Sequence, residues 1–133
     1  MVFVADNLTR LRRVIPVVLL FGTAGILHFV MPTFFERIVP PWVPDAKLAG
    51  QVSGAAEILG AAGLLWSRTR VLAAWALIAL LVAVFPANVQ MLQLARASAA
   101  SNWSVAVLWA RLPVQLLLLW WVWRTAIARH TAR

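Results

Sequence analysis

Long apolar runs separated by short polar segments fill most of this chain. The runs lie near residues 14–31, 48–66, 71–92 and 103–124. Each is close to the roughly 20 helical residues needed to cross a hydrocarbon core of about 30 Å. None alternates between polar and apolar positions as barrel strands do, and only helices or closed barrels satisfy their backbone hydrogen bonds within a bilayer. The pattern predicts an all-α integral membrane four-helix bundle, formed by residues 1–133 as a single domain.

The polar intervals predict how the helices connect. Ser67–Arg70 is so short that the second and third helices must be antiparallel neighbours, which favours an up-down-up-down arrangement. In the first interval, Thr33-Phe34-Phe35-Glu36 has the spacing of a capping box, and the prolines at 40, 41 and 44 should end the short helix that it starts. This short helix could lie at the outer interface or cover the bundle as a lid. A plain apolar connecting loop is the alternative.

The first apolar run follows three arginines, as the core of a signal peptide would. It is longer than such a core, however, and no small-x-small cleavage pattern follows it. We therefore expect a retained first helix, with Pro16 tolerated in its first turn.

The charge distribution orients the predicted bundle. The chain has 12 Lys and Arg against 4 Asp and Glu, for a net charge of +8. These basic residues cluster at predicted helix ends, so we expect no nucleic-acid partner. Three of them fall in the loops of one side, and eight fall on the opposite side, which by the positive-inside rule is cytoplasmic together with both termini. The eight are Arg10, Arg12, Arg13, Arg68, Arg70, Arg124, Arg129 and Arg133.

The tryptophans agree with this orientation. Trp66, Trp120, Trp121 and Trp123 fit an inner aromatic belt, and Trp42 and Trp103 fit an outer one.

The absence of cysteine limits the chemistry. Without thiols the chain can form neither disulfides nor a thiol relay, and it cannot hold an iron–sulfur cluster through thiolates. Its two histidines, His28 and His130, fall at opposite membrane faces, so we expect no haem. We also expect no other metal site.

Two charges inside the predicted helices stand out. Glu57 and Arg111 fall about 12–14 Å from the outer face, at the helical rise of about 1.5 Å per residue. A lone charge near the bilayer centre costs roughly 2.5–3.5 kcal/mol on insertion scales, so two opposite charges at one depth are best explained as partners.

Further polar residues fall at or above this depth: His28, Asn88 and Gln115. Pro86 should free the carbonyl of Val82, for which Arg111, Asn88 and Gln115 are candidate donors. The residues around Glu57 are small, which permits either close helix approach or an open space beside the carboxylate. They are Gly50, Ser53, Gly54, Gly60 and Ala61.

The cluster has two interpretations. It could hold the helices together, because polar contacts between helices stabilise bundles modestly. It could instead line an outward-facing pocket for a small molecule, a proton or a quinone head group. The candidate ligand-binding residues are His28, Glu57, Asn88, Arg111 and Gln115.

Several motifs together resemble the DoxX-like family of small four-helix bacterial membrane proteins. They are Gly25-Ile-Leu-His28-Phe29, Ile38-Val-Pro40-Pro41-Trp42, Ser53-Gly54-Ala-Ala-Glu57-Ile-Leu-Gly60, Phe85-Pro86-Ala87-Asn88 and Arg111-Leu-Pro113-Val-Gln115. The resemblance implies the bacterial inner membrane and an association with quinone-linked redox complexes, and it selects the same five residues. The cysteines of the redox-associated branch are missing here.

These observations favour a membrane protein that binds a small ligand, with quinone as the candidate, or serves as the membrane subunit of a redox-linked complex. We expect no catalysis by this chain alone. The alternatives are an assembly or chaperone factor and a small proton-coupled transporter using Glu57. Expected partners are the lipid bilayer, a small molecule, a membrane protein or a second copy of the chain.

Overall fold

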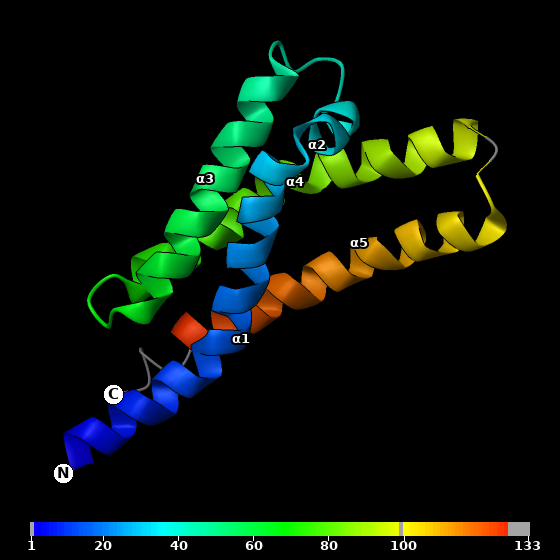
Figure 1. Cartoon of the computed structure of the whole chain (residues 1–133). Coiled ribbons are helices and arrows are strands. Elements are labelled where there is room, and N and C mark those ends of the chain that lie inside the picture. Colours follow the sequence, from blue (N-terminus) through cyan, green and yellow to red (C-terminus); the bar gives the residue numbers. More distant parts are fainter. Residues whose placement is uncertain (1, 99, 128–133) are drawn as a thin grey trace.

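The computed structural model describes residues 2–98 and 100–127, and their regular structure is helical throughout. Five α-helices follow one another, and the fifth continues into a short π-helix (Figure 1). They are α1 (Val2–Val30), α2 (Pro32–Ile38), α3 (Ala46–Leu65), α4 (Arg70–Ala97), α5 (Asn102–Val122) and the π-helix η1 (Trp123–Ile127).

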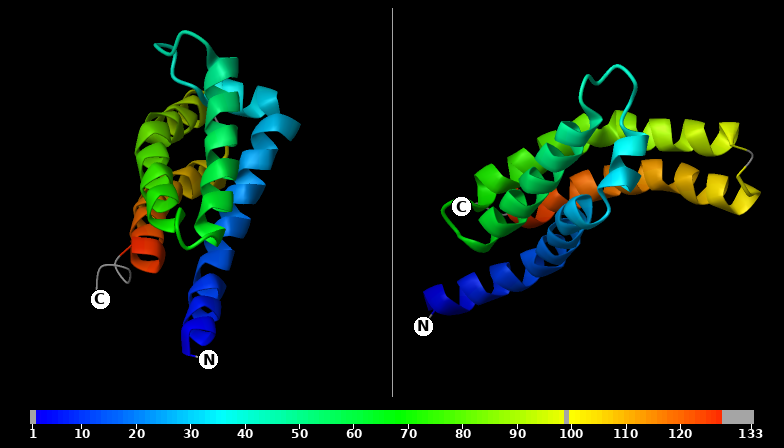
Figure 2. Two further views of the ribbon diagram at one scale, coloured as in Figure 1. Left: turned by 90° about the vertical axis from the view of Figure 1, so that its left-hand side faces the viewer. Right: turned by 45° about the horizontal axis from the view of Figure 1, so that its top comes forward.

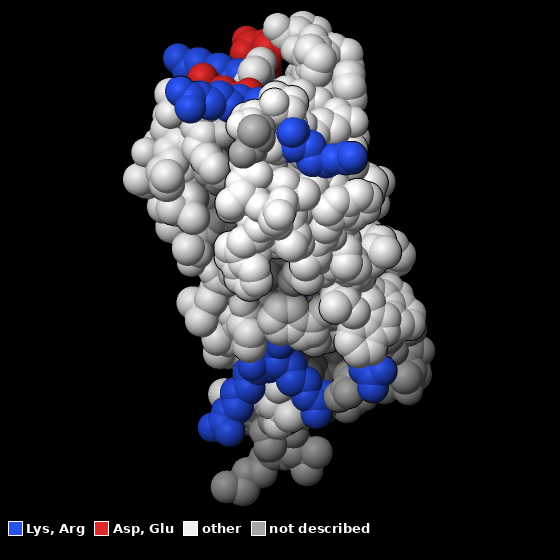
Figure 3. Space-filling view, turned by 90° about the vertical axis from the view of Figure 1, so that its right-hand side faces the viewer, with Lys and Arg blue, Asp and Glu red and all other residues white. Residues whose placement is uncertain are grey.

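Four stretches are long and apolar enough to cross a membrane: Leu11–Val30, Ala46–Leu65, Arg70–Ala97 and Asn102–Ile127. Charged side chains gather toward two ends of the face shown in Figure 3, with an uncharged band between them. The prediction of a multi-pass, all-helical membrane protein is confirmed. Arg129, His130 and Arg133, which entered the charge and haem arguments, lie outside the described residues.

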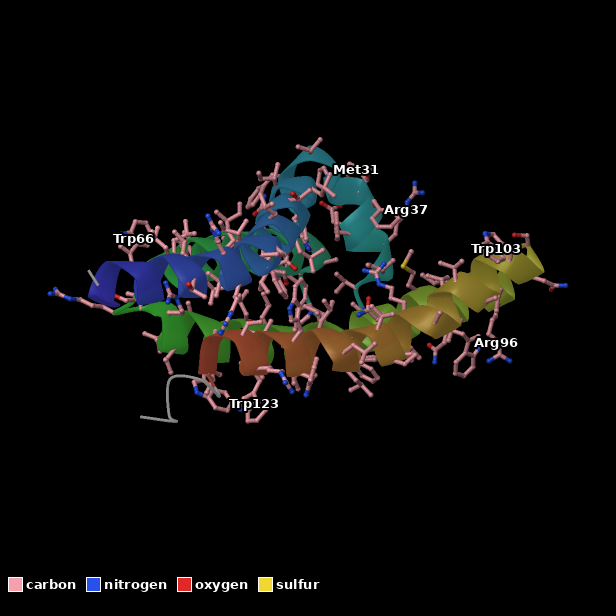
Figure 4. The ribbon with its side chains drawn as sticks, turned by 90° about the horizontal axis from the view of Figure 1, so that it is seen from below. Met31, Arg37, Trp66, Arg96, Trp103 and Trp123 are labelled. Carbon is pink, nitrogen blue, oxygen red and sulfur yellow. The ribbon has the colours of Figure 1, made fainter. Side chains whose placement is uncertain are left out.

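Exposed tryptophans mark the two ends of the molecule. Trp66 and Trp123 lie toward one end, and Trp103 lies at the opposite end near Arg96 (Figure 4). All three tryptophans are exposed, at 63%, 43% and 78% respectively. This separation agrees with two aromatic belts at opposite interfaces.

The start of α1 differs from the prediction. The helix begins at Val2, so Pro16 lies in its interior and not in its first turn. The proline has no N–H for the carbonyl of Arg12. Arg12 and Arg13 are exposed, so this carbonyl lies beside polar surface and the helix can continue through the proline.

The start of α2 also differs, whereas its end is as predicted. Pro32 occupies the first turn and Met31 precedes the helix without a side-chain cap, so Thr33 does not form the expected capping box. A proline at the first helical position suits this start, since its missing N–H would have no partner there. The helix ends at Ile38, and Val39 is extended because it precedes Pro40.

Helix α3 is the centre of the packing. It lies against α1, α2 and α4, while α5 packs on α4 and η1 packs on α4 and α1. The side chains of Val14, Val17, Leu64, Leu77 and Val122 are fully buried in one core cluster, near the turn between α3 and α4.

Away from this core, α4 and α5 run side by side and project together beyond α1 and α3 (Figures 1 and 2). Residues of all five α-helices line a cavity beside this divergence.

Candidate functional site

The cavity that these helices line has a volume of about 570 Å³. This volume lies within the range of roughly 300–1,000 Å³ that is usual for small-molecule sites. Residues of all five α-helices line it, and most of them are apolar or aromatic. One wall comes from α2 and the segment after it, with Phe34, Phe35, Ile38, Val39, Pro40, Trp42 and Val43.

All five residues that the sequence pattern selected line this one cavity. His28 comes from α1, Glu57 from α3, Asn88 from α4, and Arg111 and Gln115 from α5. The structure thus brings together four helices at the predicted cluster. Whether the cluster binds a ligand stays a prediction, but the contacts below divide the five residues into two groups.

In the first group, His28 and Glu57 contact each other across the α1–α3 seam. Nε2 of His28 lies 3.6 Å from Oε2 of Glu57, which is an ion-pair distance but too long for a hydrogen bond. Both side chains are about one-eighth exposed. Nδ1 of His28 faces the backbone at Gly50 but makes no hydrogen bond of good geometry, and Oε2 of Glu57 also has no hydrogen-bond partner. Enclosed polar atoms of this kind call for a function or a missing partner.

The direct Glu57–Arg111 contact that the sequence predicted is therefore replaced by a Glu57–His28 contact. Arg111 lines the same cavity from α5, but the ion-pair contact of Glu57 is with His28. Both residues line the same cavity, as the prediction of equal depth requires, but depth does not determine which helices are adjacent. Helix α3 packs on α1 and α4, so the nearest polar partner of Glu57 comes from α1.

Arg111 is exposed and retains much of its hydrogen-bonding capacity. Its Nη1 lies 3.9 Å from the sulfur of Met91. A thioether is a weak acceptor, whereas a guanidinium carries five N–H donors. Arg111 can therefore offer donors to an oxygen atom inside the cavity.

The second group ties α4 to α5. Nδ2 of Asn88 donates to Oε1 of Gln115 at 2.6 Å, and Nε2 of Gln115 donates to the carbonyl of Leu81. Gln115 is only 3% exposed. Its acceptor, the carbonyl of Leu81, is one residue earlier than the predicted carbonyl of Val82. Gln115 is thus satisfied within the protein, and its position is structural.

A close crossing of α1 and α3 places His28 beside Glu57. A Cβ atom at Gly25 would lie 2.7 Å from the carbonyl oxygen of Gly54, and one at Gly54 would lie 2.6 Å from Cβ of His28. At Gly50, by contrast, a Cβ atom would be 4.0 Å from its nearest neighbours. The helices therefore approach closely at Gly54, whereas an added Cβ at Gly50 would make only ordinary van der Waals contact.

Sequence reasoning missed the role of Phe35. Its ring stacks on the imidazole of His28, with centroids 3.7 Å apart and an angle of 24° between the planes. Both rings line the cavity, so this segment is a helix that forms part of the site and is more than a connecting loop. The run of aromatic residues in this segment was the available signal.

A metal centre is not supported by the described part of the chain, where no group of three or more His, Cys, Asp or Glu side chains comes together.

Residues 17–126 match a family model described as Domain of unknown function (DUF8561). The match covers most of the chain and includes every residue that lines the cavity. Of the five α-helices, only the start of α1 lies outside it. The chain belongs to this family. No curated protein and no solved structure matches it.

Proposed function

We propose that this protein is a DoxX-like protein of the bacterial inner membrane that binds the head group of a quinone, or a similar small ligand, in its cavity. One observation carries the proposal. Polar side chains from four separate helices line a single, largely apolar cavity of about 570 Å³. A few polar groups placed in an apolar space are typical of sites for small organic molecules.

The polar groups present suit a neutral head group with carbonyl oxygens. Arg111 supplies donors to one oxygen, and its partner Met91 competes weakly for them. On the opposite wall, His28 and Glu57 hold polar atoms without hydrogen-bond partners, so a small shift of either side chain lets it engage a ligand. Phe35 and Trp42 provide flat apolar surface for the ring.

The orientation follows from charge. In this proposal the helices run up-down-up-down, both termini are cytoplasmic, and α2 lies at the outer interface above the cavity. The cavity then faces the outer side, because α2 and the segment after it form its wall. Arg12, Arg13, Arg68 and Arg124 lie on the cytoplasmic side.

Ligand binding is tested with purified protein in lipid nanodiscs. The probe is a dimethoxy-methyl-benzoquinone with a decyl tail, and protein-bound quinone is measured by extraction and mass spectrometry. We expect saturable binding of about one quinone per chain. Arg111→Met should weaken it about tenfold, or about 1.4 kcal/mol, as expected for the loss of a charge-assisted hydrogen bond.

Arg96→Met is the matched control. Arg96 is exposed near the end of α4 and does not line the cavity, so its loss should change the dissociation constant less than twofold. An absence of saturable binding would contradict the proposal, as would an equal loss in both variants.

One further observation favours a membrane-protein partner as a second candidate function. The far part of the α4–α5 pair projects beyond the other helices, and Trp103, Val107 and Trp109 on it are about half exposed or more. This surface suits helix–helix contacts with another subunit, as in a redox-linked complex or an assembly factor. Chemical cross-linking in intact membranes from a cysteine at Trp103 tests this idea. A specific cross-linked species supports it, and cross-links to lipid alone contradict it.

A further inference from the structure

The cavity is bordered by two helices that do not close on each other. Helix α1 packs mainly on α3, α2 and η1, whereas α5 packs mainly on α4 and η1. The two helices approach each other at η1 and diverge from there, with α1 following α3 and α5 following α4 (Figures 1 and 4). Both helices line the cavity but do not pack closely on each other beside it, and the stretch between them is called the gap below.

Apolar side chains line both edges of this gap. Leu20, Ala24 and Leu27 of α1 and Val114 and Leu118 of α5 all border the cavity. Leu20 is 43% exposed and Val114 is 47% exposed, so the edges are accessible from outside the molecule. Both helices are apolar enough to span a membrane. In the proposed orientation the gap faces hydrocarbon, and the cavity with its polar side chains lies beside it.

We infer that the gap between α1 and α5 is a lateral entrance, through which a lipid-soluble ligand moves from the bilayer into the cavity and in which its apolar tail stays. This inference rests on the proposed function and names the class of ligand: a neutral, planar polar head on a single long apolar tail, such as a long-chain quinone. A cavity that opened only to water could admit the head but would leave no apolar path for the tail.

A phospholipid fits the same entrance less well. Its phosphate would enter a cavity that contains the carboxylate of Glu57 as well as the guanidinium of Arg111. A neutral head avoids the repulsion between phosphate and carboxylate.

Two probes with one head group test the inference: dimethoxy-methyl-benzoquinone without a tail and with a decyl tail. Binding is measured in nanodiscs and expressed against the quinone concentration in the bilayer. On binding, the tail moves from the hydrocarbon of the bilayer to the apolar entrance, which changes its free energy little. We therefore expect the unmodified protein to bind the tailed and tailless probes with affinities that agree within about threefold. Ala24→Phe places a ring in the entrance. This variant should weaken binding of the tailed probe at least tenfold and binding of the tailless probe less than threefold.

Thr23→Phe is the control, since Thr23 is exposed beside Ala24 on α1 and does not line the cavity. It should change the binding of neither probe, and the melting temperatures of both variants are measured to check that they are folded.

Binding of the tailless probe alone to the unmodified protein overturns the lateral entrance but leaves the proposed function intact. Equal weakening of both probes by Ala24→Phe also overturns it. Binding of neither probe overturns the proposed function itself, and a phospholipid recovered at one molecule per chain overturns the assignment of a neutral head.

Discussion

Gly25 and Gly54 meet so closely that neither has room for a side chain. A Cβ atom on Gly25 would lie 2.7 Å from the carbonyl oxygen of Gly54, and a Cβ atom on Gly54 would lie 2.9 Å from the carbonyl oxygen of Gly25. This contact sets the separation of α1 and α3. It thereby sets the distance between His28, three residues after Gly25, and Glu57, three residues after Gly54.

The first prediction follows from this crossing. Gly54→Ala should lower the free energy of unfolding by about 1–2 kcal/mol, because overpacking of about 1–3 kcal/mol exceeds the gain in helix propensity of up to about 1 kcal/mol. Gly22→Ala is the control. Its Cβ would lie at an ordinary 4.0 Å from that of Ala61, so the propensity gain should dominate and the variant should be equally or more stable. Unfolding in mixed micelles of dodecyl maltoside and sodium dodecyl sulfate measures both, and equal effects at the two glycines would contradict the close crossing.

The contact between His28 and Glu57 predicts energetic coupling. In a double-mutant cycle with His28→Gln and Glu57→Gln, the coupling energy should be about 0.5–3 kcal/mol, as for residues in contact. A cycle between Glu57→Gln and Arg111→Met should give less than about 0.5 kcal/mol, because these side chains do not touch. The same unfolding measurement serves for both cycles. Stronger coupling to Arg111 than to His28 would show that the charge pair expected from depth alone forms in the membrane.

Gln115 should matter more for folding than for binding. Gln115→Leu removes the donor to the Leu81 carbonyl and the acceptor of Asn88, leaving two polar groups without partners. We expect a loss of about 1–3 kcal/mol in unfolding free energy. Gln93→Leu, at an exposed position on the same helix as Asn88, should stay within about 0.5 kcal/mol of the unmodified protein. Comparable stability of the two variants would rule out a structural role for the Gln115 network.

Arg70 is predicted to hold the end of α3. It is only 5% exposed, and it donates from Nε to the carbonyl of Leu64 at 2.8 Å and from Nη2 to that of Leu65 at 3.3 Å. Arg70→Met keeps the apolar stem but removes these donors, and should cost about 1–3 kcal/mol. Arg68→Met, at an exposed position two residues earlier, should have little effect on the melting temperature. If both variants have the same melting temperature as the unmodified protein, Arg70 does not stabilise the end of α3.

Membrane orientation can be tested directly, because the chain has no cysteine of its own. Single cysteines at Asp45 and Ser101 should react with an impermeant thiol reagent in intact cells. A cysteine at Ser67 should react only after the membrane is opened. All three positions are exposed, so burial in the protein does not protect them. The reverse labelling pattern would invert the proposed topology and place the cavity toward the cytoplasm.

The sequence by itself determined the spans and the members of the polar cluster. Each apolar run is long enough to cross a bilayer, and such a run must be helical there because no water is available for its backbone groups. Polar residues inside these runs are few, so their depth could be read from the helical rise of each span. His28, Glu57, Asn88, Arg111 and Gln115 were therefore identified without knowing how the helices pack.

Only the tertiary structure decided which of these residues are partners. Depth along a helix says nothing about the direction of a side chain or the identity of the neighbouring helix. Glu57 meets His28 because two glycines let α1 approach α3 closely, while Gln115 reaches the Leu81 carbonyl because α5 packs on α4. The stacking of Phe35 on His28 and the gap between α1 and α5 arise in the same way, since both depend on contacts between segments far apart in the sequence.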